Sequence, residues 1–162
     1  MQRRLEPELM NGDAQVQAYA VADFSSGDQA TLEAIQQLLF TTSPLPADPL
    51  LVDLGCGPGN ITLRLAELFP RARIIGIDGA ESMLALARER AQQQQLEISF
   101  LCQTLQEVLE GPLLGQADLI VSNSLLHHLH QPDLLWMVSR ALAAPGCRAL
   151  HRDLRRPASD AE

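Results

Sequence analysis

The spacing of apolar residues in the first part of the chain predicts one amphipathic helix. Leucine and isoleucine at positions 32, 35, 38 and 39 lie on one face of this helix, which we place at 28–40. A shorter helix is expected over 14–22, between two glycine-containing turns. The three prolines within 41–49 predict a linker that separates these helices from the rest of the chain.

After the linker, short apolar runs alternate with segments of helical periodicity. We predict strands over 50–54, 73–77, 97–101, 119–121 and 147–150, helices over 61–69, 81–94 and 133–143, and a short helix or loop over 106–109. This alternation predicts the α/β class, with an open, mostly parallel, doubly wound sheet of about five strands. Because such sheets bind ligands beyond the carboxyl ends of their strands, the residues that follow each strand are the candidate site.

Composition narrows the possible functions. The 162 residues suffice for one domain, and the 46% apolar and 20% charged fractions exclude a disordered or fibrous chain. All 12 basic residues are arginine, so the chain has neither a Schiff-base lysine nor a phosphate-binding Walker lysine. The net charge of −8 argues against a nucleic-acid partner.

The cysteines and the start of the chain indicate the compartment. Cys56, Cys102 and Cys147 are far apart and odd in number, so we expect buried, reduced thiols and no metal site. The first residues lack the apolar run of a signal peptide. No stretch approaches the roughly 18 apolar residues of a membrane span. The sequence therefore predicts a soluble, cytoplasmic protein with no membrane partner.

A glycine loop follows the first predicted strand, in the run VDLGCGPGN. Gly55, Gly57 and Gly59 allow a sharp turn and a close approach of the backbone to a ligand. They are expected to leave free amides at the start of the next helix, where an anionic group is favoured. Asp78, 19 residues beyond Gly59, ends the second strand. A carboxylate there accepts hydrogen bonds from the two hydroxyls of a ribose.

A nicotinamide-binding loop is the first alternative for this motif. Its GxGxxG pattern requires a glycine at Asn60 when counted from Gly55, and glycine or alanine at Thr62 when counted from Gly57. Both registers fail, so a nicotinamide cofactor is disfavoured. A glycine turn without a ligand is disfavoured too, because two acidic strand ends accompany the loop.

Four motifs together resemble class I S-adenosylmethionine-dependent methyltransferases. VDLGCGPGN resembles the first motif of that family, and GIDGAESML at 76–84 resembles the second. ADLIVSNSLLHHL at 117–129 is similar to the fourth-strand motif, and LAAPG at 142–146 to the turn before strand five. The resemblance covers about 48–153. It implies a Rossmann-like fold, S-adenosylmethionine as the cofactor and methyl transfer as the reaction.

The resemblance also implies roles for the matching residues. The cofactor-binding positions are Asp53, Gly55, Gly57, Gly59, Asp78, Ala80, Met83, Gln103, Thr104 and Asn123. The glycines line the methionine part, Asp53 holds its ammonium group and Asp78 binds the ribose. Ala80 and Met83 pack against the adenine ring. Gln103 stands where the family often has an acidic residue, and its amide oxygen can accept from the adenine amino group.

Methyl transfer needs an aligned acceptor and a site without water, and it needs a base only where the acceptor must lose a proton. The resemblance places Asn123 at the methionine end of the cofactor. His127 and His128 follow it and are the candidate bases, because histidine titrates near neutral pH. The alternative is that the two histidines serve structure and pocket shape.

The chain is expected to have three parts: an N-terminal helical, substrate-covering segment with its linker at 1–47, the cofactor-binding domain at 48–153 and a polar tail at 154–162. Tyr19 and Phe24 would close over the methyl site or simply pack. The sequence ends about a dozen residues after the fifth strand begins, so we expect a truncated sheet without the family's final antiparallel hairpin. A second copy or another partner would then cover the edge of strand five.

These observations predict a methyltransferase that acts on an unidentified small molecule by in-line transfer. The alternative is a truncated pseudoenzyme, or a subunit that needs a partner, which binds S-adenosylmethionine without turnover. An aminopropyl transferase would share the fold, but the acidic groups for its acceptor cannot be placed in this sequence. The Asn-Pro-Pro-Tyr motif of nucleobase methyltransferases does not occur.

Overall fold

The computed structural model describes residues 12, 16, 18, 22 and 24–154. The strands are β1 (Leu50–Leu54), β2 (Arg73–Asp78), β3 (Ser99–Cys102), β4 (Ala117–Asn123) and β5 (Ala143–Arg152). The helices are α2 (Ser25–Phe40), α3 (Asn60–Leu68), α4 (Glu81–Gln93), α5 (Leu105–Val108) and α6 (Asp133–Leu142). Most of the helix predicted over 14–22, including Tyr19, and the tail after residue 154 lie outside the described residues.

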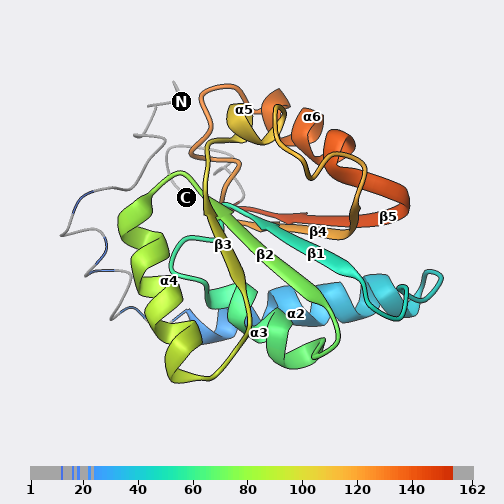
Figure 1. The fold of residues 1–162 in the computed structure, drawn as a ribbon, viewed down its shortest axis with the longest axis horizontal. Coiled ribbons are helices and arrows are strands. Elements are labelled where there is room, and N and C mark those ends of the chain that lie inside the picture. The colour runs from blue at the N-terminus through green and yellow to red at the C-terminus, as the bar shows by residue number, and fades with distance from the viewer. Residues whose placement is uncertain (1–11, 13–15, 17, 19–21, 23, 155–162) are drawn as a thin grey trace, which may run out of the picture.

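The five strands form one sheet in the order β3-β2-β1-β4-β5, and every neighbouring pair is parallel. Helices α2, α3 and α4 cover one face, and α5 and α6 cover the other (Figure 1). All five residues of β1 are buried, as a central parallel strand between two helical layers requires. The predicted α/β, doubly wound sheet is confirmed.

Alternating side chains of the central strands pack into two apolar cores, one on each face of the sheet. Leu51 of β1 packs with Ile35 of α2 and Leu65 of α3 on one face. Its neighbour Val52 points to the other face and packs in the core that contains Leu135 of α6. This period of two explains how short, continuously apolar strands hold helices on both sides.

The start of β5 differs from the prediction. The turn expected at Pro145-Gly146 is part of the strand, which begins at Ala143. Ala117 pairs with Ala143 and Leu119 pairs with Arg148, so the register shifts across the Pro-Gly pair. Proline lacks an N–H to donate and Gly146 has φ +82°, so the chain bulges there and then resumes its pairing with β4.

The cysteines differ in part from the prediction as well. All three are free, but only Cys56 is buried, whereas Cys102 is exposed and Cys147 is half-buried. Cys102 is the last residue of the edge strand β3, where no second strand covers it. Within the described residues, no set of three His, Cys, Asp or Glu side chains is placed to hold a metal ion. None of the helices in the described part is both long and apolar enough to span a bilayer.

A half-buried histidine, His151, joins β4, β5 and α6. Ser122 Oγ lies 2.8 Å from His151 Nδ1, and Ser139 Oγ lies 3.1 Å from His151 Nε2. The single hydroxyl proton of Ser139 is donated to the carbonyl of Leu135, 2.7 Å away. Ser139 must therefore accept from Nε2–H, which leaves Nδ1 as the acceptor for Ser122. This arrangement suits a neutral ring, and burial lowers the pKa of His151.

We expect acid to remove the stabilisation that His151 provides. Because its pKa in the folded chain lies below the ordinary value of 6.5, the unfolded chain takes up a proton first as the pH falls. Urea unfolding of the wild type and of His151→Gln, at pH 7.5 and 5.5, measures this directly. The free-energy difference between the two proteins should shrink at the lower pH. An unchanged difference would contradict the assignment of a neutral ring.

Candidate active site at the carboxyl ends of the strands

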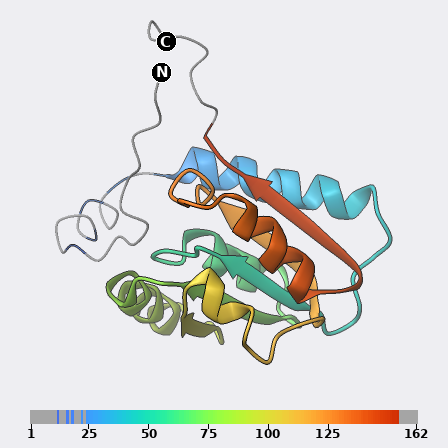
Figure 2. The same ribbon diagram turned by 90° about the horizontal axis from the view of Figure 1, so that it is seen from above.

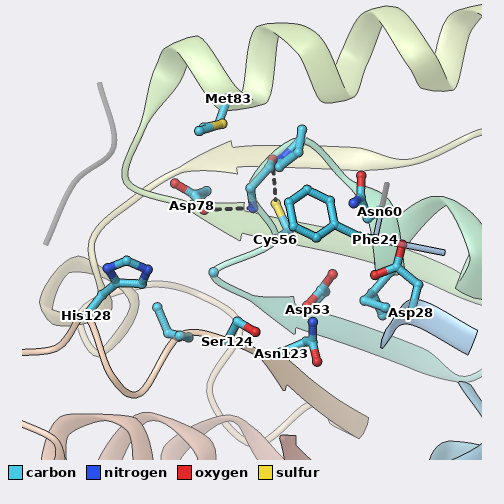
Figure 3. Close-up of a pocket in the computed structure, with 15 residues that line it drawn as sticks. Phe24, Asp28, Asp53, Cys56, Asn60, Asp78, Met83, Asn123, Ser124 and His128 are labelled. Carbon is cyan, nitrogen blue, oxygen red and sulfur yellow. Dashed lines mark hydrogen bonds between the residues drawn. The ribbon is translucent and has the colours of Figure 1, made fainter. Parts of the chain in front are cut away.

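A pocket opens at the carboxyl ends of β1, β2 and β4, beside the start of α2 (Figure 3). Of the residues predicted for the site, the structure places Asp53, Gly55, Gly57, Asp78, Met83, Asn123 and His128 in its wall. Phe24, the second aromatic residue predicted to lie over the site, lines it as well. Residues far apart in the sequence therefore converge on the edge of the sheet that the strand pattern indicated.

Gly55 and Gly57 have a conformation that favours glycine, with φ of +68° and +51°. A Cβ atom on Gly55 would lie 2.7 Å from Cδ1 of Leu125, whereas one on Gly57 would meet nothing within 4 Å. Gly55 thus allows the loop after β4 to approach the loop after β1. The space beside Gly57 is open to a ligand.

The amides of the glycine loop itself are hydrogen-bonded within the protein. The N–H groups of Gly55 and Cys56 donate to the carbonyl of Ile77, at 2.8 and 3.0 Å. Gly57 N donates to Asp78 Oδ2 at 2.8 Å. The loop docks on the end of β2 through these bonds, because parallel strands bring their carboxyl ends to one edge. These amides therefore position the loop. The free amides predicted at the start of α3 (Asn60–Leu68) stay a prediction.

Asp78 has capacity left for a ligand. Its Oδ2 accepts from Gly57 and its Oδ1 accepts from the amide of Ala80 at 2.8 Å. Burial raises the pKa of Asp78, and these two hydrogen bonds lower it by less. An ionised carboxylate has about four lone-pair positions, so each oxygen can accept one further hydrogen bond. A vicinal diol fits these two positions.

Asp53 is a buried carboxyl group of the pocket whose pKa is strongly raised. It is 2% exposed, and Thr62 Oγ1 donates to its Oδ2 at 2.6 Å. Burial raises its pKa to about 7, the bond from Thr62 lowers it, and the carboxylates of Asp78 and Asp28 raise it. A buried carboxyl group with this pKa is ionised readily when a cation enters beside it.

The prediction missed Asp28, which brings a third carboxylate to the pocket. It is 5% exposed, and Arg64 Nε lies 3.9 Å from its Oδ2. The buried residues of α2 are Asp28, Thr31 and Ile35, which share one helical face. An acidic residue in phase with the apolar face was therefore the signal in the sequence that pointed to this residue.

The two candidate histidines occupy different environments. His128 is 9% exposed and lines the pocket, and its charge lowers the pKa of Asp78. His127 is not part of the pocket wall, and its Nδ1 lies 2.7 Å from Oδ1 of Asp153. Asp153 Oδ2 also accepts from the amide of Leu126 at 2.6 Å. This contact joins the loop after β4 to the end of β5.

Four other predicted cofactor residues lie outside the pocket wall. Gly59 allows α3 to approach α4, since a Cβ there would lie 3.2 Å from that of Ala87. The main-chain amide of Ala80 donates to the carboxylate of Asp78. The main-chain amide of Gln103 donates to the main-chain carbonyl of Asp78, 3.0 Å away. Thr104 caps α5 in a capping box with Glu107.

The sequence profile of the family described as "Methyltransferase domain" matches residues 51–146, more than half of the chain. The chain belongs to the class I S-adenosylmethionine-dependent methyltransferases. A trans-aconitate 2-methyltransferase of Variovorax paradoxus is 41% identical to this methyltransferase over 108 residues, which are 67% of this chain and 39% of that protein. The chain spans less than half the length of this curated relative.

Solved methyltransferases share the fold. A SAM-dependent methyltransferase from Aquifex aeolicus superposes with a TM-score of 0.71 at 17% identity, over 91% of this chain and 75% of that one. The magnesium protoporphyrin IX methyltransferase of Synechocystis PCC 6803, solved with bound SAM, has a TM-score of 0.55 at 26% identity, over 72% and 54% of the two chains. S-adenosylmethionine is the cofactor of this family.

Proposed function

We propose that this methyltransferase binds S-adenosylmethionine in the pocket and promotes in-line transfer of its methyl group to a small-molecule acceptor. One observation carries the proposal: a buried carboxyl group, Asp53, and a half-buried one, Asp78, flank a glycine loop that leaves open space beside Gly57. The cofactor offers a matching pair of groups, an ammonium and a ribose diol. Residues and ligand therefore fit in both charge and hydrogen-bonding capacity.

Within this proposal each part of the pocket has one role. Asp78 accepts from the ribose hydroxyls through its two unfilled lone-pair positions. Asp53 holds the ammonium group, and Asp28 adds negative charge at the same end. Met83, 2% exposed on α4, offers an apolar surface for the adenine ring. Phe24 and Leu125 line the pocket and help to exclude water.

The bound cofactor supplies a methyl group on a positively charged sulfur, which keeps the bonding electron pair when the methyl group leaves. The chain must then align the acceptor and, for an alcohol or amine, remove a proton. His128 is the titratable base in the pocket wall that could take this proton. A carboxylate acceptor is already deprotonated at neutral pH and needs no base.

The first acceptor to test is trans-aconitate, because curated relatives are named for it. The purified chain is incubated with S-adenosylmethionine, with and without trans-aconitate, and S-adenosylhomocysteine is measured by mass spectrometry. Acceptor-dependent product supports the proposal. Binding of S-adenosylhomocysteine without turnover on a panel of acids, alcohols and amines would favour the non-catalytic alternative. A folded protein that binds no cofactor would contradict both.

His128→Asn distinguishes the acceptor classes. With a carboxylate acceptor, we expect kcat to change less than about threefold, because no proton has to be removed. With an alcohol or amine acceptor, kcat should fall about 100-fold or more, the usual contribution of a general base. Initial rates between pH 6 and 9 provide the measurement, with His127→Asn as the matched control outside the pocket wall. Equal losses in both variants would contradict a role for His128 as the base.

A further inference from the structure

A chain of hydrogen bonds reaches the pocket from outside it. Arg152 Nη1, at the end of β5, donates to Thr31 Oγ1 of α2 at 2.9 Å. Thr31 Oγ1 in turn donates to Asn123 Oδ1, at the end of β4, at 3.0 Å. Thr31 is 0% exposed, and Figure 2 shows α2 running alongside β5. The bonds therefore join three elements at the edge of the pocket.

The number of protons on each group determines which group donates in each of these hydrogen bonds. Arginine only donates, and a threonine hydroxyl has a single proton, so Thr31 accepts from Arg152 and donates once. The carbonyl of Gly27, 3.0 Å from Thr31 Oγ1, is the competing acceptor. Arg152 Nη1 donates to that carbonyl at 2.7 Å. Asn123 Oδ1 carries no proton, so its 3.0 Å contact with Thr31 Oγ1 is a hydrogen bond only when the proton of Thr31 points to it.

This assignment sets the orientation of the Asn123 amide. With Oδ1 held by Thr31, the NH₂ group is the side of the amide that is available to a ligand. Figure 3 shows the nitrogen of Asn123 on the side of Asp53 and its oxygen on the far side. The pocket has a second amide of this kind, because Asn60 Oδ1 accepts from Arg90 Nη1 at 2.9 Å. Both oxygens are thus occupied by groups outside the pocket wall.

We propose that Thr31 and Arg152 are positioning residues, which turn the Asn123 amide so that it donates to the carboxylate of the cofactor's methionine part. This inference rests on the proposed function. The pocket carries the carboxylates of Asp28 and Asp53, and none of the described residues in its wall is an arginine. A ligand carboxylate therefore needs neutral donors there, and an amide whose oxygen faced the pocket would repel it. In this way Thr31 of helix α2 contributes to cofactor recognition through Asn123, without contacting the cofactor itself.

The test compares two ligands that differ only in the carboxylate. Calorimetry measures binding of S-adenosylhomocysteine and of its decarboxylated analogue, 5′-(3-aminopropylthio)-5′-deoxyadenosine. Thr31→Val should weaken S-adenosylhomocysteine about tenfold, the usual worth of a hydrogen bond to a charged group, and should change the analogue less than about twofold. Thr31→Ser keeps the hydroxyl and should restore binding. Arg152→Met, at an exposed position, should act in the same direction even if Thr31→Val folds poorly.

Each other outcome overturns the inference. Equal losses for both ligands would mean that Thr31 only packs, and unchanged affinity for S-adenosylhomocysteine in the valine and methionine variants would mean that the amide does not meet the carboxylate. A folded wild type that binds neither ligand would overturn the proposed function itself. A wild type that binds both ligands while the variants show no selectivity would overturn the positioning role alone.

Discussion

Replacing Asp78 by alanine is expected to weaken S-adenosylhomocysteine binding by about 100-fold or more. Each hydrogen bond to a charged group contributes roughly 1.5–3 kcal/mol, so the loss of two bonds to the ribose amounts to at least about 3 kcal/mol. The variant also loses the bonds from the amides of Gly57 and Ala80, each 2.8 Å long, which dock the glycine loop on β2. Isothermal titration calorimetry at pH 8 measures the change.

The matched control for Asp78 is Glu81→Gln. Glu81 lies three residues later at the start of α4, and its carboxylate pairs with Arg88 at 2.6 Å on the surface. Its removal should leave binding unchanged. An analogue of S-adenosylhomocysteine without the 2′-hydroxyl separates the loss of direct contact from disorder of the loop. The analogue should bind to the wild type more weakly than S-adenosylhomocysteine does. Its affinity for the wild type should not fall below the affinity of S-adenosylhomocysteine for Asp78→Ala. Wild-type affinity in Asp78→Ala would contradict the assignment.

Lowering the pH from 7 to 5 is expected to weaken S-adenosylhomocysteine binding to the wild type by about 50-fold, through Asp53. Only its ionised form attracts the ammonium group, and its pKa is about 7 in the free protein. Below that pH the ionised fraction falls about tenfold for each pH unit, while the ammonium group stays charged. Affinity should level off near pH 8, and binding below pH 7 should release a proton. Calorimetry in buffers of different ionisation enthalpy measures both quantities.

Asp53→Asn tests the source of this pH dependence. The variant should bind more weakly at pH 8, because it has lost the charge, but its affinity should fall much less between pH 7 and 5. Thr62→Val removes the hydroxyl that donates to Asp53 at 2.6 Å and should move the onset of the loss to higher pH, because that bond lowers the pKa. A wild type with pH-independent affinity, or an Asp53→Asn variant that keeps the full slope, would rule out this mechanism.

Local patterns in the sequence were sufficient to predict the architecture and the residues at the centre of the pocket. Apolar runs of five or six residues between helical segments predict buried parallel strands, since only such strands are covered on both faces. The carboxyl ends of parallel strands meet at one edge, so Asp53, Asp78 and Asn123 had to lie close together. The glycine loop could be placed by its spacing alone, because its backbone requirements are local.

Only the tertiary structure separated His127 from His128, because neighbouring residues in an irregular loop point in directions that no short-range periodicity determines. Only the structure brought Asp28 into the pocket, since its place depends on how α2 packs over β1. The hydrogen bond between Thr31 and Asn123 joins residues 92 positions apart. Such contacts depend on the relative placement of whole elements, which is set by the packing of their apolar faces and not by the polar residues that finally meet.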